Sequence, residues 1–193
     1  MRNIYVVAHS EATHHVAGVV GGWHDSQLTP VGVRDAFSIA EALRGKIPEE
    51  SHVVLFSSDL QRALQTAKIV GDVLHITPLL DQHFIPPPLT GDRMQHDEGV
   101  PGAETKEAFA QRVYAIMDVI LESNCEHLVI VTHGFAITFI VASWIGMPIE
   151  SLGYVNFRVA SGSITTLRED DYFHNRQVVS LSDTLHLAHL TQT

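Results

Sequence analysis

Two histidines directly follow short apolar stretches that lie far apart in the sequence. His9 follows residues 4–8 (Ile-Tyr-Val-Val-Ala), and His133 follows residues 128–132 (Leu-Val-Ile-Val-Thr). Both stretches are rich in β-branched side chains, which favours short buried strands. The carboxyl ends of parallel strands meet at one edge of a sheet, where α/β proteins place their ligands. We therefore expect the two histidines to share one crevice.

An arginine is expected at the same edge. The apolar residues 53–56 precede Ser57-Ser58-Asp59, which can cap a helix, and Arg62 falls in the first turn of that helix. Two imidazoles, a guanidinium and the N–H groups of helix starts form a concavity suited to a phosphate group. A neutral imidazole is also a nucleophile that forms covalent intermediates. With 13 histidines in the chain, the combination with Arg62 carries the prediction rather than any single histidine.

Strands and helices alternate in the pattern up to residue 145. Strands are expected over residues 4–8, 53–56, 76–80 and 128–132, and helices over 30–43, 60–74, 104–122 and 135–145. The last third switches to short alternating runs at 154–159, 163–167 and 177–181. This order predicts a three-layer α/β sandwich, with a mostly parallel sheet, helices on both faces, and antiparallel or edge strands near the C-terminus.

The chain length of 193 residues suits a single domain over residues 1–193. Two segments interrupt the regular pattern. Residues 12–28 are rich in glycine and read as a loop, in which Trp23 either lines a substrate pocket or anchors the loop. Residues 81–103 contain three consecutive prolines, and a polar segment of this length predicts a lid or an active-site loop.

Composition narrows the class of partner and compartment. A net charge of −10 argues against nucleic-acid binding but is compatible with a locally positive pocket for an anionic metabolite. The lone Cys125 permits no internal disulfide, which favours a reducing, cytoplasmic location. No apolar run reaches the ~18 residues of a membrane span. The apolar residues 135–145 fit a helix that covers the sheet or one that forms a homodimer interface.

Four segments, in order along the chain, resemble the motifs of the histidine phosphatase superfamily, which includes the cofactor-dependent phosphoglycerate mutases. Residues 6–12 (VVAHSEA) are similar to a strand followed by RHGE(T), and residues 25–32 (DSQLTPVG) to its D-s-p-L-T-x-x-G segment. Residues 57–67 (SSDLQRALQTA) are similar to S-S-x-L-x-R-A-x-x-T-A, and residues 131–134 (VTHG) to V-s/t-H-G. These segments span most of the chain, so the resemblance implies the same fold and phosphoryl-transfer chemistry.

The resemblance implies a role for each matching residue. His9 would attack the phosphoryl group and carry it as phosphohistidine, while Arg62 and His133 would hold the phosphoryl oxygens. Ser10, His15, Gly134 and Trp23 would contact the substrate, with Ser10 in place of the motif glycine and His15 in place of an asparagine. Neither a metal nor a cofactor is expected, because the cationic side chains supply the charge stabilisation.

Two positions depart from the motifs. Ala8 stands where the motif has an arginine, and the loss of such a charged hydrogen-bond donor typically costs ~1.5–3 kcal/mol. His14, His15 and Arg93 are candidates to replace its charge. The glutamate expected after the third strand, as proton donor, falls on Pro86, so the donor candidates move to the polar segment that follows: Asp92, Asp97 and Glu98.

The sequence thus predicts a phosphatase that hydrolyses a small phosphorylated metabolite through a phosphohistidine on His9. Ala8 and the displaced glutamate keep a second interpretation open, a degenerate member that binds a phosphorylated ligand or regulates with little turnover. A phosphoglycerate mutase-type phosphoryl transferase is a third. A metal-dependent hydrolase built on surplus histidines such as His14, His15 and His96 is the most distant alternative, because the sequence has no helical metal-binding spacing and no cysteine ligand pair.

Overall fold

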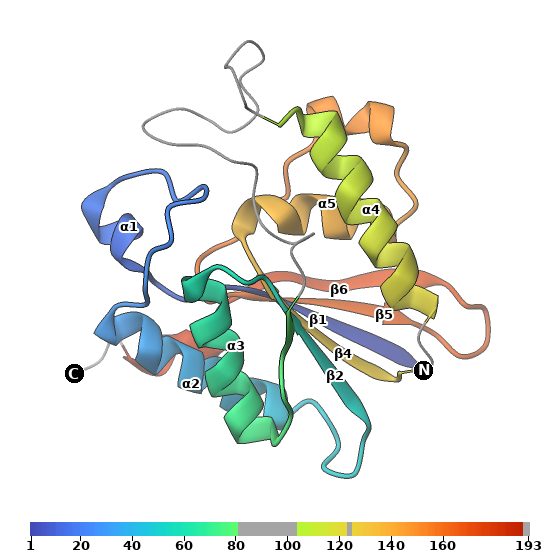
Figure 1. The fold of residues 1–193 in the computed structure, drawn as a ribbon. Coiled ribbons are helices and arrows are strands. Elements are labelled where there is room, and N and C mark those ends of the chain that lie inside the picture. The colour runs from blue at the N-terminus through green and yellow to red at the C-terminus, as the bar shows by residue number, and fades with distance from the viewer. Residues whose placement is uncertain (81–103, 123–124, 191–193) are drawn as a thin grey trace.

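A six-stranded mixed sheet with the order β3-β2-β4-β1-β5-β6 forms the centre of the computed structural model, which describes residues 1–80, 104–122 and 125–190 (Figure 1). The strands are β1 (Arg2–Ala8), β2 (Val53–Ser57), β3 (Leu79–Leu80), β4 (His127–Thr132), β5 (Ile164–Glu169) and β6 (Arg176–Asp183). The first four are mutually parallel, β5 is antiparallel to β1, and β6 is antiparallel to β5.

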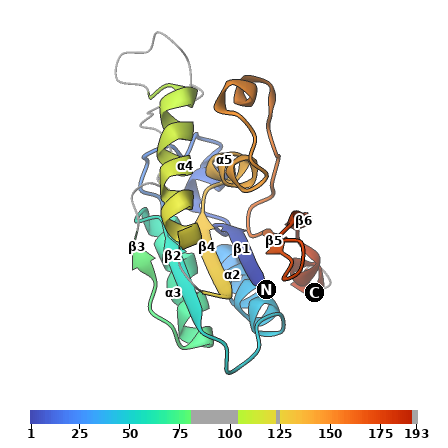
Figure 2. The same cartoon turned by 90° about the vertical axis from the view of Figure 1, so that its right-hand side faces the viewer.

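Helices cover both faces of this sheet. They are α1 (Thr13–Ala17), α2 (Pro30–Arg44), α3 (Gln61–Leu74), α4 (Lys106–Glu122) and α5 (Gly134–Trp144), with 3-10 helices η2 (Ile149–Tyr154) and η3 (Leu185–Leu190). Figure 2 shows α2 and α3 on one side of the sheet and α4 and α5 on the other. The predicted three-layer α/β class, with antiparallel strands near the C-terminus, is confirmed.

The central strand β1 is apolar on both faces because it lies between the two helical layers. Ile4 and Val6 pack into the core that α4 and α5 complete, whereas Tyr5 and Val7 pack into the core of α2 and α3. Burial on both faces explains why the strand reads as a continuous apolar run rather than an alternating one.

The pairing register brings the strand ends to one level. Ala8 is paired with Thr132, so His9 and His133 are the next residues on neighbouring strands. The His9 N–H donates to the carbonyl oxygen of Thr132 at 2.8 Å, and the Ser58 N–H donates to that of Val131 at 3.1 Å. Backbone hydrogen bonds therefore place both histidines and Ser58 together before any side-chain contact is made.

Three predicted elements differ from the structure. Residues 154–159 do not form a strand, because Tyr154 ends η2 and the Phe157 N–H donates to Thr138 Oγ1 at 3.1 Å instead of to a neighbouring strand. Phe157 instead packs against the core of α4 and α5. The predicted loop over 12–28 contains the five-residue helix α1, and the strand expected over 76–80 is limited to β3.

Helix α5 is enclosed by its own chain. Every residue from Ala136 to Trp144 is buried, many of them in the core shared with α4, and this burial accounts for its apolar composition. A homodimer stays a prediction. Within the three described ranges, the helices are too short or too polar to cross a membrane.

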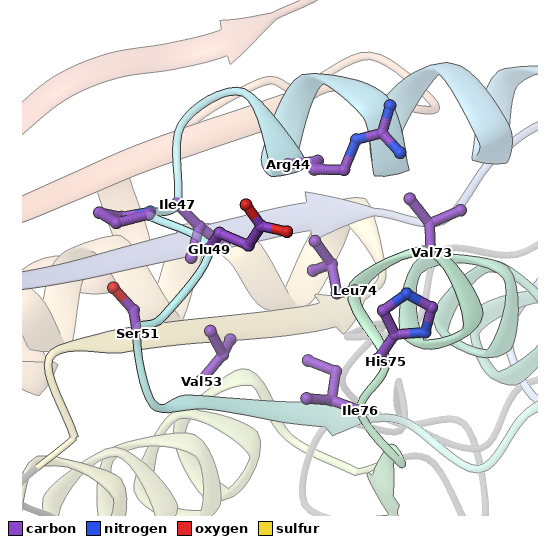
Figure 3. Close-up of a pocket in the computed structure, with 10 residues that line it drawn as sticks. Arg44, Ile47, Glu49, Ser51, Val53, Val73, Leu74, His75 and Ile76 are labelled. Atoms are coloured by element: carbon purple, nitrogen blue, oxygen red, sulfur yellow. The ribbon is translucent and has the colours of Figure 1, made fainter.

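A cavity of about 430 Å³ lies near the start of β2 and the ends of α2 and α3 (Figure 3). Arg44, Val53, His75 and Ile76 are among its lining residues. Val53 begins β2, whereas Ser57 ends it, so this cavity lies at the end of the sheet away from His9. It is separate from the strand-end residues predicted to do chemistry.

Candidate active site

The protonation of His9 is fixed by the backbone next to it. Its Nδ1 atom lies 2.9 Å from the carbonyl oxygen of Ser10, and since a carbonyl only accepts, Nδ1 carries the proton. The Nε2 atom therefore presents its lone pair. Arg62 Nε donates to this same Nε2 at 3.2 Å, as expected for an unprotonated nitrogen. A neutral ring with a free Nε2 is the form that can attack phosphorus.

Arg62 is held by the loop that precedes α2. Its Nη1 donates to the carbonyl oxygen of His24 at 2.6 Å and its Nη2 to that of Gly22 at 2.8 Å. The side chain is only 1% exposed, and burial lowers the pKa of Arg62 to about 10, so the guanidinium stays charged at neutral pH. In the sequence Trp23 stands between Gly22 and His24, whose carbonyls accept from Arg62, and 53% of its surface is exposed.

His133 is oriented by Ser58. Its Nε2 lies 2.9 Å from Ser58 Oγ, and its ring meets that of His9 edge-on with 5.0 Å between centroids. A Ser58 hydroxyl that donates to Nε2 leaves the proton on Nδ1, which is buried without a partner. Burial, followed by the effect of His9, holds the pKa of His133 well below its usual value. His133 is thus a neutral ring, with Gly134 after it as the first residue of α5.

Ser10 supplies a second buried polar atom without a partner. Its N–H donates to Thr66 Oγ1 at 3.2 Å, while its own Oγ is among the three buried side-chain polar atoms left unpaired in the described residues. Unpaired buried polar groups cost about 1–3 kcal/mol each. Ser10 Oγ belongs to the residue after His9, and His133 Nδ1 belongs to the ring that meets His9 edge-on, so both are candidates to donate to an anion bound at His9.

The short helix α1 adds two further imidazoles. His14 is buried, with Nδ1 2.7 Å from Ser26 Oγ, and its ring centroid lies 4.0 Å from that of His15. His15 accepts the Ala12 N–H at its Nδ1 over 3.1 Å and stacks on His9 at 5.4 Å. Burial, with His15 and Arg62 nearby, lowers the pKa of His14 to about 3, so His14 does not restore the charge that an arginine at position 8 would bring.

The structure brings most of the predicted residues together. His9, Arg62, His133, Ser10 and His15 are linked by the contacts above. Ala8 brings no cation to the site. Its side chain is 3% exposed and packs in the core of α4 and α5. The donor candidates Asp92, Asp97 and Glu98, and likewise Arg93 and the expected lid 81–103, lie outside the described residues.

Sequence reasoning missed the residues that hold the site in place. Ser58 was considered only as a helix cap, and Ser26, Thr66 and the carbonyls of Gly22 and His24 were not considered as partners. His14 was considered as a source of charge and as a distant metal-ligand candidate, but not as a partner of Ser26. Their roles depend on contacts across 12–75 positions of sequence, which a local pattern does not reveal.

An imidazole with an unprotonated Nε2, a charged guanidinium and a second imidazole at the carboxyl edge of a three-layer α/β sheet are features of proteins that bind phosphoryl groups. The family model described as the histidine phosphatase superfamily (branch 1) matches residues 4–85 and 87–183. The chain belongs to this superfamily, as its motifs indicated.

Individual relatives span nearly the whole chain. A protein named "Probable phosphoglycerate mutase GpmB" from Yersinia pestis is 28% identical over 209 positions, covering 97% of this chain and 95% of its own length. The vanadate complex of mycobacterial glucosyl-3-phosphoglycerate phosphatase superposes with a TM-score of 0.76 at 20% identity, covering 95% of this chain and 100% of its own. A phosphoserine phosphatase mutant from Entamoeba histolytica, bound to phosphoserine, superposes with a TM-score of 0.72 at 22% identity over 97% and 100% of the two chains.

Proposed function

We propose that this protein is a cytoplasmic phosphatase that hydrolyses a small phosphorylated metabolite through a phosphohistidine on His9. The observation that carries the proposal is the state of the His9 ring. Its Nδ1 proton is held by the Ser10 carbonyl, and its Nε2 lone pair faces the guanidinium of Arg62. A nucleophilic nitrogen and a cation therefore converge on one point, as in-line attack on a phosphoryl group requires.

In the first step, His9 Nε2 forms a bond to phosphorus as the bond from phosphorus to the leaving oxygen breaks. Arg62 shifts its Nε–H from Nε2 to a phosphoryl oxygen, and His133 Nδ1 and Ser10 Oγ donate to the others. The leaving oxygen takes a proton from a carboxylic acid. In the second step, water attacks phosphorus, the Nε2–phosphorus bond breaks, and the water proton passes to the same carboxylate, which yields inorganic phosphate.

We assign the proton donor to the segment 81–103, with Asp97, Glu98 and Asp92 as the candidates. Two carboxylates near the site within the described residues are already engaged. Glu11 accepts the Thr29 hydroxyl at 2.6 Å, and Asp25 accepts the Gln61 N–H at 2.7 Å. The segment 81–103 would also act as the lid over the substrate.

Hydrolysis is favoured over mutase chemistry by Ala8. A mutase must retain a phosphorylated intermediate until it is transferred back, which calls for a strongly cationic pocket. Among the described side chains that contact His9, Arg62 is the charged donor, while burial lowers the pKa values of His14, His15 and His133. The second candidate is a member that binds a phosphorylated ligand with little turnover, and the same observation favours it, because fewer cations stabilise the transition state less.

The test is phosphate release from p-nitrophenyl phosphate and from a panel of sugar and glycerate phosphates, with EDTA present. We expect turnover by the native chain, no turnover by His9→Ala, and native rates for His174→Asn, which alters an exposed histidine outside the site. A protein-bound phosphate that is stable to alkali and labile to acid should accumulate in a rapid quench and be absent from His9→Ala.

The outcomes separate the alternatives. Tight vanadate binding without turnover would favour the ligand-binding member. Transfer of the phosphoryl group to a second substrate hydroxyl, faster than to water, would establish a mutase. Turnover that survives His9→Ala would contradict the phosphohistidine step.

A further inference from the structure

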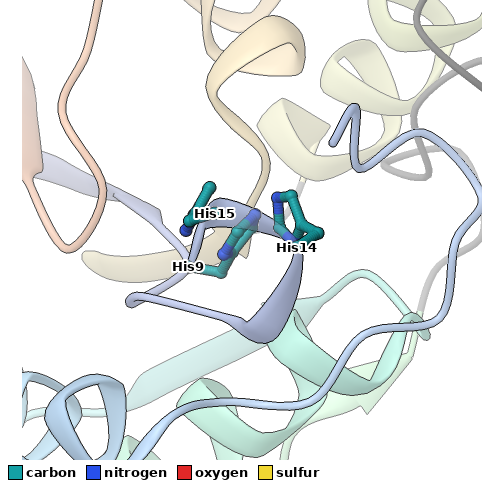
Figure 4. A group of neighbouring side chains, drawn as sticks. All are labelled: His9, His14 and His15. Carbon is teal, nitrogen blue, oxygen red and sulfur yellow. The ribbon is translucent and has the colours of Figure 1, made fainter. Parts of the chain in front are cut away.

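Three imidazoles converge at the carboxyl end of β1. His9, His14 and His15 each offer a ring nitrogen, and these three atoms lie within 4.8 Å of one another (Figure 4). His9 follows β1, whereas the other two lie on α1, and stacking of His15 on His9 brings the two elements together. Of these three histidines, only His9 takes part in the phosphoryl-transfer steps proposed above. The grouping of three imidazoles is therefore not explained by those steps.

Imidazole binds metals through an unprotonated ring nitrogen, and the His9 ring presents one at Nε2, because its Nδ1 proton is held by the Ser10 carbonyl. Neutral imidazole is the preferred ligand of zinc, copper and nickel ions. The cluster thus offers three nitrogen donors of the type that such ions prefer.

We propose that His9, His14 and His15 bind one divalent transition-metal ion of the zinc class, and that the bound ion blocks the active site. Three imidazoles with a water in the fourth position give the tetrahedral arrangement that zinc favours. The ion takes the lone pair of His9 Nε2, which is the pair that attacks phosphorus. Metal binding and phosphoryl transfer therefore exclude each other.

Two of the rings already have the outer partners that metal-binding histidines use. His9 donates from Nδ1 to the Ser10 carbonyl, and His14 places Nδ1 2.7 Å from Ser26 Oγ, so each ring can direct Nε2 at an ion. His15 must give up its hydrogen bond from the Ala12 N–H to expose a lone pair. Tetrahedral donors about 2.05 Å from zinc lie roughly 3.3 Å apart, so the rings must close in.

Arg62 opposes the ion. It donates to His9 Nε2 at 3.2 Å and carries a positive charge, so an ion at Nε2 must displace this contact and tolerate the repulsion. We therefore expect micromolar rather than nanomolar affinity. Arg62 therefore affects the two ligands in opposite ways, because its positive charge attracts phosphate and repels a metal ion. The binding does not depend on the proposed function, whereas the inhibition does.

The experiment is titration of the EDTA-stripped, desalted full chain with zinc chloride by calorimetry, repeated with Co²⁺ to detect the visible absorption of a tetrahedral site. We expect one equivalent bound and a loss of at least about 10-fold in affinity in His14→Gln and in His15→Gln. His174→Asn is the matched control. The His174 side chain is exposed, and asparagine tolerates the left-handed backbone of this position, where φ is 55°. Its affinity should equal that of the native chain.

A charge variant makes the test sharper. Arg62→Gln removes the opposing cation, so it should bind zinc more tightly while losing vanadate binding. Equal zinc affinity in the native chain, His14→Gln and His15→Gln would mean that surface histidines bind adventitiously, and would overturn the proposal. Zinc bound at the cluster in a chain without phosphatase activity would uphold the site and refute the proposed function. Phosphatase activity that persists with the cluster saturated would refute the inhibition.

Discussion

His9 and His133 differ in the kind of group that contacts their ring nitrogens. The backbone of Ser10 sets the tautomer of His9, so no single side-chain replacement removes that control. The Nε2 atom of His133 instead contacts a side chain, the Ser58 hydroxyl, which can either donate or accept. The nucleophile is therefore protected against substitution of its partner, and the second imidazole is not.

This difference predicts the effect of Ser58→Ala. Without the hydroxyl, His133 Nε2 loses its partner and the ring can carry its proton on either nitrogen, so a buried Nδ1–H no longer faces the phosphoryl group. We expect kcat on p-nitrophenyl phosphate to fall by about 10-fold, equivalent to ~1.4 kcal/mol of transition-state stabilisation.

Ser57→Ala is the matched control, because the buried Ser57 hydroxyl donates only to the neighbouring Ser58 carbonyl at 2.7 Å. It should leave kcat within about twofold of the native value. Equal losses in the two variants would contradict the orienting role of Ser58 and indicate a general loss of packing.

Arg62→Lys tests the guanidinium. A lysine keeps the charge but cannot contact His9 Nε2 and the carbonyls of Gly22 and His24 at once, as the three nitrogens of Arg62 do. Loss of charge-assisted hydrogen bonds worth ~1.5–3 kcal/mol should lower kcat/KM by about 10- to 100-fold. Steady-state kinetics with circular dichroism as a folding control would measure it, and an unchanged kcat/KM would remove Arg62 from the phosphoryl site.

At the level of elements, α2 is seated against the segment that follows the nucleophile. Thr29 caps α2 by accepting the Gly32 N–H, and its hydroxyl donates to the Glu11 carboxylate. A Cβ built on Gly32 would lie 1.9 Å from the Glu11 carbonyl oxygen. The glycine is required for this close approach of helix and strand end.

Gly32→Ala should therefore separate α2 from residues 9–11. We expect a loss of about 3 kcal/mol in the free energy of unfolding, measured by urea titration, together with reduced phosphatase activity. Gly45→Ala, at the other end of α2, is the control, since its nearest neighbours would be 3.6 Å from the new Cβ and its φ is −70°. If Gly45→Ala destabilised the chain as much as Gly32→Ala, the close approach would not be the cause.

The elements that position the site could be predicted where periodicity is strong. The strands before His9 and His133 and the helix carrying Arg62 were predicted from apolar runs and capping residues, and the strand ends meet as expected. Helix α1 was missed because five residues in a glycine-rich stretch give no helical period. Residues 154–159 have strand-forming side chains, but a tertiary contact with Thr138 satisfies the Phe157 N–H, so local propensity did not decide the outcome.

Across the whole molecule, buried neutral histidines make the fold sensitive to acid. The pKa values of His9, His14, His127 and His133 are all lowered, with desolvation as the first cause. In the unfolded chain a histidine titrates near pH 6.5, so as the pH falls below that value the unfolded state binds protons that the folded state excludes. Stability is therefore full above about pH 6.5 and declines as the pH drops towards the folded-state pKa values.

His127→Leu should weaken this acid sensitivity. His127 is 7% exposed on β4, and its Nδ1 has no partner, so leucine removes both a titrating group and an unpaired polar atom. Urea titrations at pH 7.5 and 5.5 should show a pH dependence reduced by up to about 1.4 kcal/mol per pH unit, the value of one proton. If the free energy of unfolding of His127→Leu had the same pH dependence as that of the native chain, His127 would not be the group that is protonated on unfolding.

The pairing of β1 with β4 determines when, during synthesis of the chain, the site around His9 can form. The hydrogen bond from the His9 N–H to the Thr132 carbonyl joins positions more than 120 residues apart. During synthesis the first imidazole leaves the ribosome early but gains its partner only when β4 has been made and inserted between β1 and β2. Vanadate binding by nascent chains of increasing length would thus report the moment at which the sheet closes around its central strands.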